Sequence, residues 1–195
     1  MRAVEPTEIL DLSAYELVRS ERREHLLELK KLRRVHVGEH VTLLFENRDT
    51  VLYQIQEMVR IERLVKPDEI AHEVQTYNEL VPAEGGLSAT LFIEYESVAE
   101  RDQSLRDLLG LEHHVWLEVG AGERLGARFD RRQVATEKLS AVQFVRFPLT
   151  GAARALWPSE AEKGGVAVVV EHPRYQARSV LSQPVARELE RDFAE

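Results

Sequence analysis

One run, FENRDTVLYQIQEMVRIERL at residues 45–64, constrains the fold of this chain more than any other segment. It is typical of an apolar strand end that leads into an amphipathic helix, because Ile55, Met58 and Val59 recur at helical spacing. Glu62 lies seven, four and three positions after these residues, so the same helical face should carry its carboxylate. A carboxylate on an apolar face needs an ionic partner, a hydrogen bond or a functional role.

Arg22 is the expected partner of Glu62. It interrupts a second helical stripe, which is formed by Tyr15, Val18, Leu26 and Leu29. We therefore predict that a helix between residues 14 and 33 packs on the helix over 48–64, with Arg22 close to Glu62. We expect this pair to be structural, since lone buried acids usually have a basic partner. The alternative is that Glu62 serves as a ligand anchor, a metal ligand or a base.

The composition predicts a globular protein. The chain has 195 residues, which suits a single domain over 1–195, and 44% of them are hydrophobic. Its net charge of −8 argues against nucleic-acid binding, because phosphate contacts need clustered Lys and Arg.

Cysteine is absent, which excludes disulfides, thiolate metal sites, iron–sulfur ligation and a cysteine nucleophile. No run approaches ~20 consecutive apolar residues, and the N-terminus lacks the apolar core of a signal peptide. We expect a cytoplasmic protein that has no contact with a membrane.

Helical patterns dominate the first half of the chain and strand patterns the second half, so the sequence predicts the α+β class. The arrangement that we expect is N-terminal helices packed on a mainly antiparallel sheet formed largely by the C-terminal half. The run Val166–Val170 is continuously apolar, as in a central strand that is buried on both faces. Residues 149–157 suggest only one or two helical turns.

Histidines offer a candidate metal site. His36 and His40 lie too far apart on an extended strand to share an ion, whereas a hairpin at Gly38-Glu39 would place them across from each other. Glu46 is the carboxylate that could complete such a site. The alternative is that these histidines form ordinary hydrogen bonds within the fold or face solvent.

Glu57 and Arg60 lie away from the apolar stripes and should belong to a mixed-charge surface. With Arg22 and Glu62 they are our candidate residues for binding a partner; a merely solvated face is the alternative. Motifs that carry chemistry are missing from the sequence: it contains no GxxxxGK[ST], GxGxxG, HExxH or GxSxG pattern. No catalytic residue and no cofactor is therefore predicted.

Three segments carry a resemblance: VGEHVTLLFENRDTVLYQIQEMVRIER at 37–63, YNELVP at 77–82 and SAVQFVRF at 140–147. Together they resemble a bacterial family of proteins of similar length and unknown function. Its members are often encoded beside a rubrerythrin and a cysteine-rich iron–sulfur oxidoreductase. The resemblance implies an association with iron or peroxide redox metabolism, and it implies no reaction.

Three functions are compatible with the sequence. One is a small-molecule sensor, in which the helix over 48–64 and the strand before it would wall a cavity, although the sequence indicates no ligand for it. The other two are more specific. The first is a non-catalytic accessory protein that binds a protein partner, such as a redox enzyme, or a second copy of itself. The second is a metal-dependent enzyme or metal-binding protein that uses histidine and carboxylate ligands. We favour the first, because a protein without thiols or a cofactor motif has no group that carries electrons.

Overall fold

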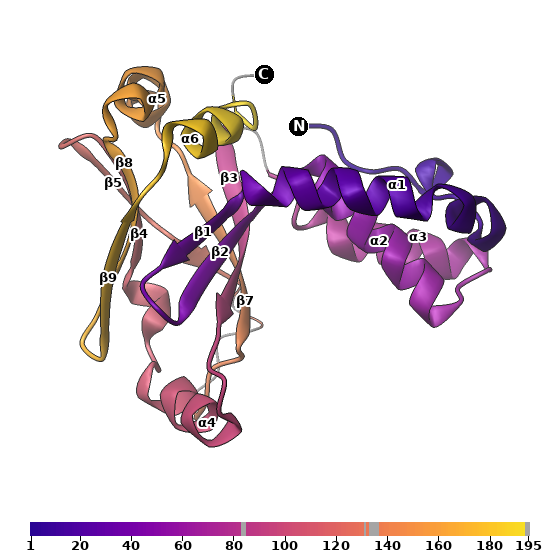
Figure 1. The fold of residues 1–195 in the computed structure, drawn as a ribbon, viewed down its shortest axis with the longest axis horizontal. Helices are drawn as coiled ribbons and strands as arrows, with labels where there is room; N and C mark the ends of the chain where they lie inside the picture. Colours follow the sequence, from indigo (N-terminus) through magenta and orange to yellow (C-terminus); the bar gives the residue numbers. More distant parts are fainter. Residues whose placement is uncertain (83–84, 131, 133–136, 194–195) are drawn as a thin grey trace.

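The computed structural model describes residues 1–82, 85–130, 132 and 137–193, and it has the expected α+β class (Figure 1). The helices are α1 (Leu12–Lys31), α2 (Arg48–Glu62), α3 (Pro67–Asn78), α4 (Val98–Asp107), α5 (Gly151–Lys163) and α6 (Gln183–Glu190), with short 3-10 turns at Pro6–Glu8 and Leu111–His113. The strands are β1 (Arg34–Val37), β2 (Val41–Glu46), β3 (Gly86–Ile93), β4 (Val115–Val119), β5 (Glu123–Gly126), β6 (Arg128–Phe129), β7 (Val142–Pro148), β8 (Val166–His172) and β9 (Tyr175–Val180).

The strands form two antiparallel sheets rather than the one sheet that we expected. Sheet A has the order β1-β2-β3-β7-β6, and sheet B has the order β5-β4-β8-β9. The N-terminal half supplies β1, β2 and β3, and the C-terminal half supplies β4 to β9, so most strands come from the C-terminal half, as expected. The chain crosses from sheet B to sheet A at Ala127, whose N–H donates to the Val115 carbonyl at 2.9 Å.

The main hydrophobic core lies between the two sheets. Alternate residues of each strand point inward, as the strand period of two requires, among them Leu43 and Phe45 of β2 and Leu117 of β4. The run Val166–Val170 is buried throughout, because β8 is a central strand between β4 and β9.

The helices α1, α2 and α3, which we call the helical lobe, extend away from the strands (Figure 1). They enclose a second core around Val51, Ile55, Val59 and Val74, as the helical spacing predicted. Phe144 of β7 packs against this core. The helical lobe therefore adjoins sheet A and does not cover a whole sheet face.

Local chemistry explains the helix ends. Asp11 caps α1 by accepting from the Ala14 N–H at 2.9 Å, and Asn47 caps α2 by accepting from the Thr50 N–H at 2.9 Å. α2 ends where Arg63 adopts a left-handed conformation. α5 is longer than predicted and contains Pro158; Trp157 holds it, because its indole N–H donates to the Ala186 carbonyl of α6 at 2.9 Å.

A buried arginine joins the start of sheet A to the C-terminal region. The Arg33 side chain is fully buried and donates to the Phe45 and Glu46 carbonyls at 2.9 and 3.1 Å. It also binds two carboxylates, that of Glu188 in α6 and that of Asp192 just after the end of α6. None of the helices in the described part of the chain is long and apolar enough to cross a membrane.

Candidate functional site

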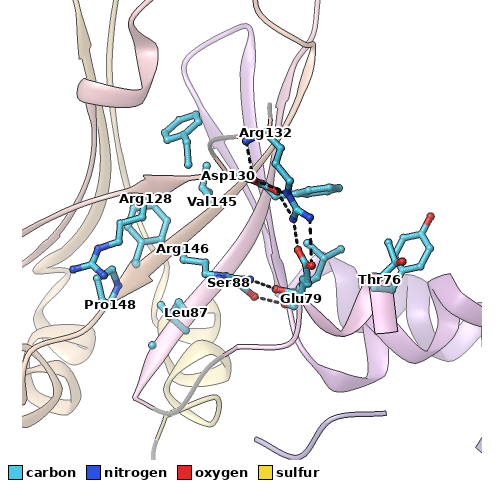
Figure 2. Close-up of a pocket in the computed structure, with 16 residues that line it drawn as sticks. Thr76, Glu79, Leu87, Ser88, Arg128, Asp130, Arg132, Val145, Arg146 and Pro148 are labelled. Atoms are coloured by element: carbon cyan, nitrogen blue, oxygen red, sulfur yellow. Dashed lines mark hydrogen bonds and ion pairs between the residues drawn. The ribbon is translucent and has the colours of Figure 1, made fainter. Parts of the chain in front are cut away.

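A cleft of about 790 Å³ lies where the end of α3 meets the outer face of sheet A (Figure 2). Strands β3, β6 and β7 form its floor, and the segment that follows α3 forms one wall. Apolar groups and arginines share this lining, which includes Leu80, Phe129, Phe144 and Pro148 beside Arg128, Arg132 and Arg146. Concave, largely apolar sites with a few polar groups are the usual places where proteins bind small molecules.

Strand register sets three polar side chains in one row across the floor. Arg146 of β7 pairs with Ser88 of β3 on one side and with Arg128 of β6 on the other. The Arg146 guanidinium turns toward the helical lobe, where it donates to the backbone carbonyl of Glu79 at 2.6 Å (Figure 2). The row therefore connects the sheet to the end of α3.

Arg132 bridges two carboxylates at the edge of the cleft. Its guanidinium donates to Asp130 at 2.7 and 3.0 Å and also binds Glu79 (Figure 2). The hydrogen bonds from Arg132 hold the pKa of Asp130 below its usual range, and the nearby charge of Arg146 acts in the same direction. Both carboxylates are therefore already engaged by arginine.

These groups suit binding better than acid–base catalysis. Arginine stays protonated at neutral pH, and a carboxylate with a lowered pKa is a poor proton carrier there. The Ser88 hydroxyl donates to the Leu80 carbonyl, so it has no base beside it among the described lining residues. The cleft can attract and orient an anion, and we assign no reaction to it.

Arg22 does not meet Glu62. Arg22 lines a separate groove of about 410 Å³ between α1 and α2, with Val18, Leu26 and Leu52. Glu62 is the last residue of α2 and is exposed, and the ion pairs of the described residues do not join it to Arg22. The predictions of a buried Glu62 and of its pairing with Arg22 are wrong, because Arg22 lies beside the start of α2, with Asp49 and Leu52, and Glu62 lies at the other end of that helix.

Glu57 takes the role that we predicted for Glu62. It accepts a bidentate pair from Arg19 at 2.8 and 2.9 Å and a hydrogen bond from the Tyr15 hydroxyl at 2.7 Å. The Arg19 hydrogen bonds lower the pKa of Glu57, while burial and the Glu57 carboxylate raise the pKa of Tyr15. Arg60 pairs with Glu16, so both predicted surface residues join α2 to α1.

The predicted histidine site is not assembled. The hairpin exists, yet the His36 Nδ1 lies 3.0 Å from the Thr42 Oγ1, and His40 stacks on Tyr95 with ring centroids 3.9 Å apart. Glu46 lies four residues beyond Thr42, about 13 Å along β2, and accepts from two threonine hydroxyls. Within the described ranges, no three His, Cys, Asp or Glu residues could hold a metal ion together.

The sequence analysis missed the cleft. Its charged residues come from three separate segments, and only the strand register reveals that Arg128 and Arg146 are neighbours. Alternation along β7 could have indicated that Arg146 faces outward, because Val145 and Phe147 on either side of it are apolar.

Comparisons with known proteins agree on a relationship and give no function. A family model described as "Protein of unknown function (DUF3501)" matches residues 3–193. A crystal structure of a novel protein of unknown function from Burkholderia pseudomallei K96243 is 34% identical and has a TM-score of 0.89. The alignment covers 98% of this chain and 100% of that chain. A search of the curated proteins gives no match.

Proposed function

Because this chain belongs to the DUF3501 family, whose function is unknown, we propose from its structure that it is a non-catalytic accessory protein that binds a protein partner through the helical lobe. The chemistry of the cleft supports the non-catalytic part of this proposal, since its carboxylates are paired with arginine. The support for partner binding comes from the far end of the helical lobe.

Large apolar side chains are exposed at that end, which we call the lobe tip and define as Leu17, Ile61 and Val65. Their exposed fractions are 87%, 60% and 71%. The ion pair between Glu16 and Arg60 brings the neighbours of Leu17 and Ile61 together, so these residues share one end of the helical lobe. Clustered exposed apolar groups with a charged rim are typical of protein–protein contacts.

Glu62 belongs to the same surface, because it follows Ile61 directly and is exposed; Arg63 comes next and is also exposed, so the margin carries both signs of charge. Arg22 lines the groove between α1 and α2. Glu57 and Arg60 link the same two helices through their ion pairs with Arg19 and Glu16, so both already have intramolecular partners. The partner that we propose therefore presents an apolar patch with charged groups of both signs at its margin.

The resemblance noted in the sequence suggests the class of partner. Members of that family are often encoded beside a rubrerythrin and an iron–sulfur oxidoreductase. We therefore propose a redox enzyme of iron or peroxide metabolism as the partner. The chain itself has no cysteine and so offers no thiolate for an electron-transfer centre.

Capture from native lysate tests this function. The bait is the full chain, and the variant combines Leu17→Ser, Ile61→Ser and Val65→Ser at the lobe tip. The matched control is Val98→Ser on α4, which is 69% exposed and lies at the far end of the sheets (Figure 1). We expect the bait and the control to capture the same redox enzyme, and the lobe-tip variant to lose it.

Three results would contradict the proposal. Equal capture by the lobe-tip variant would exclude the helical lobe as the docking surface. Capture of nothing above background would contradict an accessory role. A dimer measured by light scattering that only the lobe-tip variant abolishes would assign the surface to a second copy of the chain.

A further inference from the structure

Two arginines lie directly opposite each other on the outer face of sheet A. Arg128 and Arg146 are cross-strand partners in the antiparallel pair β6–β7. Like charges in this arrangement repel and destabilise a sheet. Figure 2 shows the two side chains diverging, Arg146 toward Glu79 and Arg128 toward Pro148. An anion bound between the two guanidinium groups would compensate this repulsion.

Arg128 has no counter-charge of its own. In the part of the chain that the structure describes, its exposed guanidinium takes part in no ion pair and no side-chain hydrogen bond. Arg146 donates only to a neutral carbonyl, although the Asp130 carboxylate is close enough for the charge of Arg146 to lower its pKa. The row therefore keeps positive charge at the cleft floor.

A third arginine approaches the same end of the cleft from α5. The Arg154 guanidinium lies against the backbone of Gly85, where a Cβ built on that glycine would be 3.0 Å from Nη1. Gly86 follows and pairs with Pro148, the residue toward which Arg128 points. Arg154 likewise has no ion pair among the described residues, so two uncompensated guanidiniums flank the Gly86–Pro148 end.

The charges suggest the valence of the ligand. Among the described lining residues, Arg128, Arg132 and Arg146 contribute three positive charges, and Glu79 and Asp130 contribute two negative charges. Arg154 beside the lining raises the resulting excess of one to two. A phosphate group carries about −1.5 to −2 at neutral pH, and guanidinium groups bind it in a bidentate manner.

We infer that the Gly86–Pro148 end of the cleft binds the phosphate group of a small phosphorylated molecule. Arg128 and Arg154 hold the phosphate oxygens, and Arg146 contributes after its side chain leaves the Glu79 carbonyl. The organic part lies along the apolar part of the floor, at Phe129 and Phe144. The site goes beyond the proposed partner binding, which uses the opposite end of the helical lobe.

Thermal unfolding and calorimetric titration test the inference with two probes, inorganic phosphate and phenyl phosphate, at constant ionic strength. We expect both probes to raise the melting temperature of the full chain, because a ligand that binds only the native state stabilises it. Phenyl phosphate should bind more tightly, since its ring is buried against Phe129 and Phe144 on the cleft floor. Arg128→Gln and Arg154→Gln should each weaken binding by at least about tenfold.

The matched control is Arg174→Gln, which removes an exposed arginine in the turn between β8 and β9. It should leave binding unchanged. Arg128→Gln should not lower the melting temperature without ligand, because it removes a like-charge contact; a merely structural arginine would give the opposite result.

Other results would overturn the inference. Equal loss of binding in Arg174→Gln would mean that net charge alone attracts the probes. Benzoate binding as tightly as phenyl phosphate would exclude a phosphate-specific site. Inorganic phosphate binding as tightly as phenyl phosphate would exclude the ester. These measurements use no partner protein, so their failure is separate from failure of the capture experiment.

Discussion

Arg33 and Asp192 form a buried ion pair, although 159 positions separate them in the chain. The Arg33 guanidinium also donates to Glu188 at 3.2 Å, so one buried cation faces two carboxylates. Burial raises the pKa of Asp192 to about 6; Arg33 opposes this rise, and the charge of Glu188 adds to it. The exposed Arg191 also binds Glu188, at 3.0 Å, so the protonation of the buried Asp192 is the part of this cluster that should matter most for stability.

We predict that the contribution of Asp192 to stability falls between about pH 4 and pH 6. Its folded-state pKa lies above its unfolded value, so the native state binds the proton more tightly. The resulting stability is present below the unfolded pKa and is lost as pH rises through the folded pKa. The expected loss is at most a few kcal/mol.

Urea unfolding of the wild type and Asp192→Asn across this range measures the effect. The free energy of unfolding of the variant, relative to the wild type, should increase as pH rises, because asparagine cannot ionise. The comparison cancels other carboxylates such as Glu57, whose lowered pKa gives the opposite pH dependence. The prediction would be contradicted if the free energies of unfolding of the wild type and the variant changed with pH in parallel.

Removing the Arg33 cation should lower the free energy of unfolding much more than removing the Asp192 charge. Arg33→Met leaves Asp192 buried without its cation and Glu188 with only the exposed Arg191, and it should destabilise the fold by about 3–5 kcal/mol. Arg34→Met is the matched control, since Arg34 is the exposed neighbour, and its effect should stay within about 0.5 kcal/mol. Urea unfolding measures both, and similar values for the two variants would rule out the buried cluster as a stabilising element.

Glu57 and Glu62 should differ in their importance for stability. Glu57→Ala removes the partner of both Arg19 and Tyr15 and should lower the free energy of unfolding by about 1–3 kcal/mol. Glu62→Ala removes an exposed side chain and should change it by less than about 0.5 kcal/mol. Chemical denaturation of the two variants at one pH makes the comparison; a larger effect at Glu62 would show that α1 and α2 pack in a different register.

Position 38 requires a glycine, both because of its backbone conformation and because neighbouring side chains leave no room for a Cβ atom. Its φ is +75°, and a Cβ there would lie 2.9 Å from the Ala177 Cβ and would collide with the Tyr175 hydroxyl. That hydroxyl donates to the Val37 carbonyl at 2.6 Å and accepts from the His40 N–H at 3.0 Å. Gly38→Ala should therefore destabilise the fold by about 2 kcal/mol or more.

The control for this substitution is Gly122→Ala, in an exposed turn where a Cβ meets nothing within 4 Å. We expect it to be nearly neutral in thermal unfolding. Equal melting temperatures for the two variants would mean that the β1–β2 turn moves freely away from Tyr175.

Local patterns were enough to place most elements. The helix at Arg48–Glu62 and the strand Val166–His172 were both expected, because hydrophobic periodicity acts over a few residues. The length of α5 was underestimated because Pro158 is a local helix breaker. The contact that favours the longer helix is the hydrogen bond from Trp157 to Ala186, a residue of the distant α6.

The residues of the candidate site were harder to predict from the sequence. Glu57 and Glu62 are both acidic residues on α2, and only the position of α1 decides which of them is paired. Likewise, Arg128 and Arg146 become neighbours only through the β6–β7 register.

The sequence by itself determined the α+β class, the identity of most helices and strands, and the absence of thiol chemistry, because these depend on composition and on spacing between near neighbours. Only the tertiary structure decided that the strands divide into two sheets, that Arg33 is buried between distant carboxylates, and that arginines of separate strands line one cleft. Such contacts depend on which distant segments become adjacent, and their free energy depends on burial and on charges that no local pattern encodes.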